Sequence, residues 1–177
     1  MTKGPWISIA PVAEATGDLK RAYDKVLATR GRMPTIRSVM AGEPLVVEGF
    51  AAFYPENNYA CRSIDRRLSE MIAIVVSVAN ESTQGAPAHA RQLAKITGDA
   101  ALAQAILSDY TNAGLSVKEC TLLDYVWKLS RTPGAMTQAD VDGLRVAGWT
   151  DSQIVATVHV CAFFSYMNRV SAAFGVT

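Results

Sequence analysis

A long apolar run, Leu68-Ser69-Glu70-Met71-Ile72-Ala73-Ile74-Val75-Val76, carries a single carboxylate at its third position. The segment from about Ser63 to Asn80 is hydrophobic on nearly every helical face, a pattern that is typical of a buried helix. Burying a carboxyl among isoleucine and valine is costly unless the group is paired or exchanges a proton. Glu70 is therefore the first candidate for a functional residue.

The first histidine of the chain, His89, follows one helix later. Between the two lies a polar break, Asn80-Glu81-Ser82-Thr83-Gln84-Gly85, and Pro87 then fits the first turn of a new helix. This helix is expected from Gly85 to Gly98, with His89 near its amino end. The positive helix end favours a neutral imidazole, which suits a base or a hydrogen-bond relay beside a buried carboxyl.

The rest of the chain predicts further helices and shows no strand-like alternation. Apolar spacing and caps place them at about 18–30, 36–54 with an interruption at Gly42 and Pro44, 99–111, 116–131, 137–147 and 151–174. The fourth of these begins with a capping box, Ser116-x-x-Glu119. We expect an all-α protein with one core and a single domain over residues 1–177.

Composition excludes several classes of function. The chain has 177 residues, half of them hydrophobic, and a net charge of +1, so no charge bias points to nucleic acid or a membrane surface. Met1 to Trp6 lack a secretory core, and the run from Met71 to Ala79 is too short to span a bilayer, so a cytoplasmic location is expected. Cys61, Cys120 and Cys161 fit neither a disulfide framework nor a zinc site. We expect no metal and no cofactor.

The order Glu70, Ser82, His89 resembles the alkylhydroperoxidase D-like (AhpD-like) superfamily, which also includes the carboxymuconolactone decarboxylases. Its peroxidase branch has a Glu, then Cys-x-x-Cys, then a His four residues after the second Cys. Glu70 and His89 match in identity and spacing. Ser82 and Gly85 stand where that branch has its two cysteines.

The resemblance extends over most of the chain, from about Val12 to the carboxyl terminus, and is greatest to the peroxidase-related subgroup. It is carried by Ala113-Gly114-Leu115-Ser116, the helix Leu123 to Leu129, the segment Asp140 to Asp151, and Asn168-Arg169. It implies the AhpD-like helical fold and assembly into a small homo-oligomer, a dimer, trimer or hexamer. The hydrophobic last helix agrees with such burial.

The missing thiols bear on the chemistry. In the family, a thiolate attacks the peroxide and the second cysteine resolves the product. A serine hydroxyl at position 82 cannot cycle through a sulfenic acid and a disulfide. Gly85 has no thiol with which to form a disulfide. The resemblance then implies proton transfer on a small organic acid or lactone by Glu70 and His89, a lyase-type reaction. A non-catalytic ligand binder or scaffold, and residual hydroperoxidase activity through Cys61, are the alternatives.

Each candidate residue also has a structural interpretation. Ser82, a third candidate catalytic residue, is more typical of a helix cap than of a nucleophile. Glu70 can pair with Arg66 or Arg67 one turn earlier. His159, in the last helix, is expected to be a core histidine. The candidate substrate-binding residues are Tyr59, Cys61, Glu81 and Gly85, of which Cys61 and Glu81 are also typical of loop residues.

Overall fold

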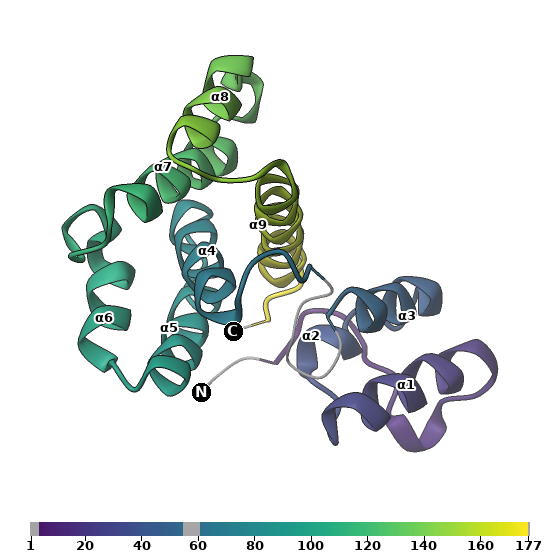
Figure 1. The fold of residues 1–177 in the computed structure, drawn as a ribbon. Coiled ribbons are helices and arrows are strands. Elements are labelled where there is room, and N and C mark those ends of the chain that lie inside the picture. The colour runs from purple at the N-terminus through teal and green to yellow at the C-terminus, as the bar shows by residue number, and fades with distance from the viewer. Residues whose placement is uncertain (1–3, 55–60, 177) are drawn as a thin grey trace. The chain divides into compact units, whose positions relative to one another are not determined.

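The computed structural model describes residues 4–54 and 61–176 of the chain (Figure 1). They divide into two compact units, residues 1–60 together with 170–177, and residues 61–169. A single domain over residues 1–177 stays a prediction, and Tyr59 lies outside the described residues. No helix in the described part of the chain is long and apolar enough to cross a membrane.

The first unit is built from α1 (Gly17–Arg30), α2 (Thr35–Ser38) and α3 (Pro44–Phe53), with α1 packed against α3. Its core consists of the buried side chains Ala22, Val26, Val39, Met40 and Val47. The helix expected over residues 36–54 is broken at the predicted place, because Pro44 begins α3. Gly31 ends α1 in the left-handed conformation, at φ +66°, which glycine adopts without strain.

The second unit contains α4 (Arg66–Ala79), α5 (Gly85–Thr97), α6 (Ala100–Asp109), α7 (Val117–Arg131), α8 (Gln138–Val146) and α9 (Asp151–Ala173) as far as Arg169. Figure 1 shows α4 with α5, α6 and α7 around it, and these helices pack against it. Eleven of the fourteen residues of α4 are buried, including Glu70, so the prediction of a buried helix is confirmed.

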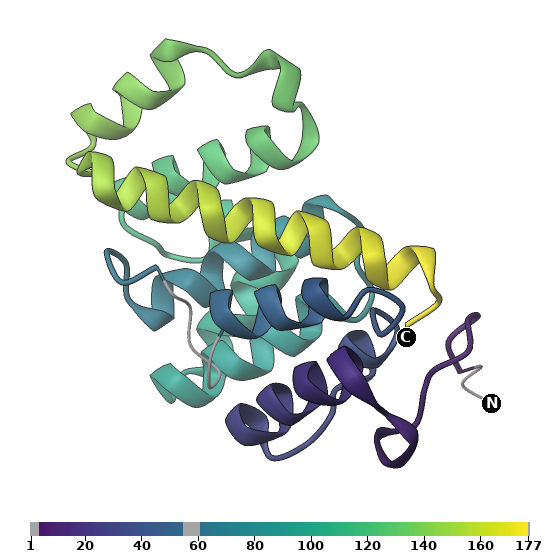
Figure 2. The same cartoon turned by 90° about the vertical axis from the view of Figure 1, so that its right-hand side faces the viewer.

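Side-chain caps fix where these helices begin. The Asp65 carboxylate accepts a hydrogen bond from the Leu68 amide at 2.7 Å and starts α4, which satisfies one of the free amides of its first turn. Ser116 and Glu119 form the predicted capping box of α7. The last helix, seen side-on in Figure 2, ends at Ala173, one residue before its predicted end. The described residues contain no strand, and the all-α class is confirmed.

Candidate active site

Glu70 and His89 meet in the second unit. The Glu70 side chain on α4 is fully buried, and its Oε2 lies 2.7 Å from Nδ1 of His89 on α5. The imidazole is itself largely buried, with 14% of its side-chain surface exposed. The two residues that the sequence pairs across nineteen positions are therefore in direct contact.

Arg66 holds the other oxygen of the same carboxylate. Its Nε and Nη2 both lie 2.7 Å from Oε1 of Glu70, one turn earlier on α4. The pairing with Arg66 and the pairing with His89 are thus simultaneous, whereas Arg67 pairs with Glu119. A buried carboxylate with a donor on each oxygen has its charge compensated.

The contact sets the hydrogen-bonding state of the imidazole. A carboxylate oxygen accepts, so Nδ1 of His89 donates, and in the neutral ring Nε2 carries the lone pair. Within the described part of the chain, Nε2 has no hydrogen-bond partner. The ring is fixed from the side by Phe164 of α9, whose centroid lies 4.3 Å away at an edge-on angle of 74°. His89 is therefore oriented with its basic nitrogen available.

Ser82 acts at the start of α5. Its half-buried Oγ accepts a hydrogen bond from the Gly85 amide at 3.1 Å, which agrees with the interpretation of Ser82 as a cap. No hydrogen bond joins Ser82 to His89 among the described residues. The structure therefore gives Ser82 a structural contact and does not pair it with a base.

The place of the second cysteine is filled by polar groups. A Cβ at Gly85 would lie 2.8 Å from Oδ1 of Asn168, 2.8 Å from Oγ of Ser82 and 2.9 Å from Oγ of Ser77. Asn168 and Ser77 are buried and joined by a hydrogen bond of 3.3 Å from Nδ2 to Oγ. This backbone therefore has no room for any side chain at position 85 unless those oxygens move.

The two groups of residues form successive layers across three helices. The first layer contains Glu70, His89 and Phe164, and the second contains Ser77, Gly85 and Asn168. In each layer the residues come from α4, α5 and α9, two turns apart on α4 and one turn apart on α5 and α9. Of Phe164, Ser77 and Asn168, the sequence analysis named only Asn168. Contacts between distant helices leave no local spacing pattern from which the other two could be predicted.

The remaining candidates are not joined to this pair. Glu81 is exposed, with φ +57°, and its carboxylate pairs with Arg131 at 3.3 Å. Cys61 is half-buried, and burial raises the pKa of its thiol, which lowers its nucleophilicity at neutral pH. The expectation of a core histidine at position 159 is wrong, since His159 lies on an exposed face of α9.

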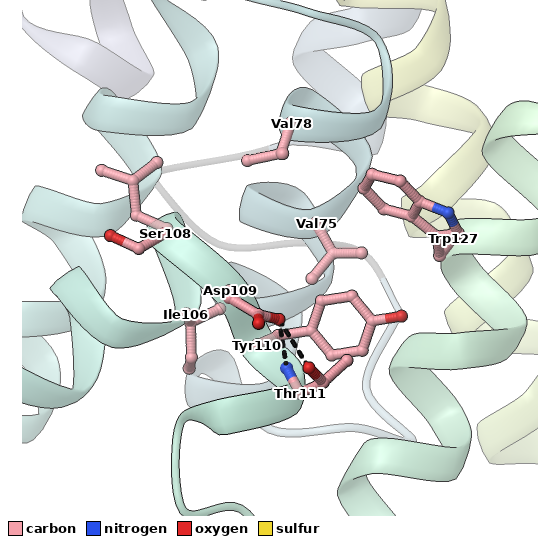
Figure 3. A pocket seen from close by; sticks show the side chains of 9 residues that line it. Val75, Val78, Ile106, Ser108, Asp109, Tyr110, Thr111 and Trp127 are labelled. Atoms are coloured by element: carbon pink, nitrogen blue, oxygen red, sulfur yellow. Dashed lines mark hydrogen bonds between the residues drawn. The ribbon is translucent and has the colours of Figure 1, made fainter.

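The second unit also contains a cavity of about 260 Å³ between α4, α6, η3 (Tyr110–Asn112) and α7. Figure 3 shows Val75, Val78 and Ile106 with the rings of Tyr110 and Trp127 around it. The Tyr110 hydroxyl donates to Asp124 at 2.9 Å, and burial together with this bond raises the pKa of the phenol. Neither Glu70 nor His89 lines this hollow.

Comparisons with known proteins give the class of the fold. No protein-family model matches the chain, and no curated protein matches it significantly. A peroxidase-related protein from Silicibacter sp. TM1040, described as uncharacterized, has 26% identity and a TM-score of 0.79, over 98% of this chain and 92% of that one. An AhpD core protein from Ralstonia eutropha JMP134 has 21% identity and a TM-score of 0.80, over 98% and 91%.

A third similar structure is the debrominase Bmp8 in a variant bound to 2,3,4-tribromopyrrole, with 16% identity, a TM-score of 0.76 and coverage of 94% and 88%. The fold of the chain is thus that of the alkylhydroperoxidase AhpD core. The resemblance to the AhpD-like superfamily and its peroxidase-related proteins, first seen in the sequence, is confirmed.

The packing at Gly85 predicts that a single added methyl group is unfavourable. We expect Gly85→Ala to lower the free energy of unfolding by roughly 1–3 kcal/mol, because three oxygens must move from the new Cβ. Gly143→Ala in α8 is the control, since a Cβ there meets nothing within 4 Å and should stabilise by about 0.5–1 kcal/mol. Urea unfolding measures both, and equal stabilisation of the two variants would contradict the crowded site.

The raised pKa of Cys61 predicts that its thiol reacts slowly with alkylating reagents at neutral pH. At neutral pH its thiolate fraction lies below that of an unperturbed cysteine, so alkylation by iodoacetamide should be slower than that of glutathione. The rate should keep rising with pH beyond the point at which an unperturbed thiol levels off. Peptide mass spectrometry at Cys61 gives the rate, and fast modification at neutral pH would restore Cys61 as a candidate peroxidatic thiol.

Proposed function

We propose that this chain is an enzyme that transfers a proton on a small organic acid or lactone, with chemistry of the carboxymuconolactone decarboxylase type. The observation that carries the proposal is the contact of 2.7 Å between Glu70 and His89, which leaves Nε2 of His89 without a partner among the described residues. An oriented neutral imidazole in a largely buried place is well suited to general base catalysis near neutral pH.

The three polar residues have different roles in this proposal. His89 accepts the substrate proton at Nε2 and becomes an imidazolium, then returns the proton to the product. Glu70 is a positioning residue, because it holds Nδ1–H and stabilises the imidazolium that forms. Arg66 compensates the charge of Glu70, so that the carboxylate remains an acceptor rather than taking the proton itself.

The same residues argue against a dithiol peroxidase cycle. Ser82 caps α5, Gly85 has no room for a side chain, and burial raises the pKa of the Cys61 thiol. The debrominase among the similar structures indicates that this fold hosts more than one chemistry. Proton transfer that needs no sulfur is therefore the reaction class that we favour.

Substitution of the pair tests the proposal. In a screen of carboxylated lactones and β-keto acids, we expect His89→Gln to lower kcat by about 10²–10⁴-fold, the usual contribution of a general base. Glu70→Gln should lower kcat as well, with a smaller effect on KM, because it loses the orienting acceptor. Glu81→Gln is the matched control, because it removes an exposed carboxylate in the loop between α4 and α5.

Ser82→Ala separates a cap from a nucleophile. We expect it to lower stability slightly and to leave kcat nearly unchanged, since the Ser82 hydroxyl accepts from the Gly85 amide at the start of α5 and makes no hydrogen bond to His89. The assignment fails if every substrate that the wild type turns over is turned over equally by His89→Gln. Loss of turnover in Ser82→Ala, with folding intact, would move the chemistry to the hydroxyl.

The cavity of Figure 3 favours a second candidate, a small-ligand binder without catalysis. Its lining combines aliphatic side chains with two aromatic rings, Tyr110 and Trp127, whose centroids lie 6.3 Å apart. A volume of about 260 Å³ suits a single planar ring with few substituents. This candidate does not involve Glu70 or His89.

Phenol serves as the probe for that candidate. Calorimetry should detect its binding to the wild type, and Val78→Phe, which fills the cavity, should weaken it by roughly tenfold or more. Leu45→Phe on α3, where the side chain is 71% exposed, is the control and should bind phenol as the wild type does. Equal binding by wild type and Val78→Phe would place the phenol elsewhere and remove this support.

We also propose that the protein acts in the cytoplasm as a small homo-oligomer. Val155, 55% exposed on the outer side of α9, and Val146, 90% exposed on α8, are apolar side chains that a second copy would cover.

A further inference from the structure

The cavity of Figure 3 combines aromatic walls with an acidic side chain. Tyr110 and Trp127 both line it, with ring centroids 6.3 Å apart and ring planes inclined by 45°. Rings inclined in this way are neighbouring walls of a hollow rather than a stacked pair. Most of the other walls are aliphatic, and among the described lining residues Asp109 is the one that carries a charge. The lining therefore offers π surfaces and negative charge, with no lysine or arginine.

A second carboxylate acts on one of these rings. The Asp124 carboxylate accepts a hydrogen bond from the Tyr110 hydroxyl at 2.9 Å. Burial, this hydrogen bond and then the charges of Asp124 and Asp109 raise the pKa of Tyr110, so the phenol stays protonated and both carboxylates act at the same ring. A hydroxyl that donates to a carboxylate is polarised by it, which strengthens the attraction of the ring face for a cation.

No cation of the described residues neutralises these two carboxylates. Asp109 accepts hydrogen bonds from Thr111 and Asn112, and Asp124 accepts from Tyr110, but neither forms an ion pair in the described part of the chain. The hydrogen bonds from the side chains of Thr111 and Asn112 lower the pKa of Asp109, so it is charged at neutral pH. These donors are neutral groups, and the negative charge beside the two rings therefore remains uncompensated.

We propose that this cavity binds a small organic ammonium ion, a protonated amine carried on a single apolar ring. The faces of tyrosine and tryptophan attract ammonium groups, and the two carboxylates supply the counter-charge. The aliphatic walls and a volume of about 260 Å³ suit the ring of the ligand. Trp127 is 37% exposed, so the ligand's charged group can keep part of its hydration, which limits the cost of desolvation.

The proposal rests on the second candidate function, in which this cavity holds a small ligand, and it specifies the charge of that ligand. It is independent of Glu70 and His89, which do not line the cavity. The probes are three compounds that share one ring and differ in charge. Benzylammonium is the cation, benzyl alcohol is its neutral counterpart of similar shape, and benzoate is the anion.

Calorimetric titration of the full chain at neutral pH is the measurement. We expect the wild type to bind benzylammonium roughly fivefold or more tightly than benzyl alcohol, because the cation gains the ring faces and the carboxylates. Benzoate should bind more weakly than either, since it meets like charge. Added sodium chloride should weaken the binding of benzylammonium and leave that of benzyl alcohol nearly unchanged, because salt screens exposed carboxylates.

Matched variants separate charge from shape. Asp124→Asn keeps an acceptor for the Tyr110 hydroxyl and removes one charge, so the preference for benzylammonium over benzyl alcohol should fall by roughly two- to fivefold. Trp127→Leu keeps an apolar wall without a π face and should weaken benzylammonium more than benzyl alcohol. Asp142→Asn removes the same charge from α8, which does not line the cavity, and should keep the wild-type preference.

Three outcomes would overturn the proposal. In the first, phenol binding depends on Val78 as expected but benzylammonium binds no more tightly than benzyl alcohol. The cavity is then a site for a neutral ring, and the second candidate function survives without this inference. In the second, Asp124→Asn and Asp142→Asn lower the preference equally, which would assign it to the net charge of the protein. In the third, no ring compound binds, phenol included, and the second candidate function fails as well.

Discussion

The second unit depends on a single buried carboxylate and its two donors. Glu70 lies within a helix of isoleucine, valine and methionine, where an unpaired charge would be strongly destabilising. Arg66 compensates it from its own helix, and His89 compensates it from the next. Because both partners are needed, α4 and α5 must keep one register, and that register brings Ser77 beside Gly85.

The two layers of residues explain how the site differs from a thiol site. The layer of Glu70, His89 and Phe164 keeps the acid and the imidazole of the AhpD-like pattern. At Gly85, in the other layer, a second cysteine would need space. Three side-chain oxygens, from Ser77, Asn168 and Ser82, occupy that space. A cysteine introduced at position 85 alone would therefore not fit this packing unless those oxygens moved.

Much of the fold was accessible from the sequence, because helix ends are encoded locally. Asp65, the Ser116 to Glu119 box and Pro44 each act within one turn, so the predicted bounds agree closely with the structure. The contact of Glu70 with His89 was accessible from the family spacing. The prediction for the region 36–54 was right about the break and less clear about the short α2 before it.

The parts that the sequence did not reveal involve contacts between distant segments. Phe164 and Ser77 come from helices about ninety positions apart, and only packing places them at the same site. His159 was assigned to the core from its apolar neighbours, but its face of α9 points outward. Arg37 gave no signal, because a four-residue helix is too short for a hydrophobic period to show which side chains are buried.

The two units therefore bury charge in different ways. In the second unit Arg66 and His89 donate hydrogen bonds to the two carboxylate oxygens of Glu70. Nε2 of His89 is the atom of this site that has no hydrogen-bond partner among the described residues. In the first unit Arg37 is buried over the Phe50 ring, and its Nη1 has no hydrogen-bond partner among the described residues. A fold shared with peroxidase-related proteins and a debrominase does not decide chemistry. In the proposed function, the unpartnered Nε2 of His89 is the group that would hold the substrate proton.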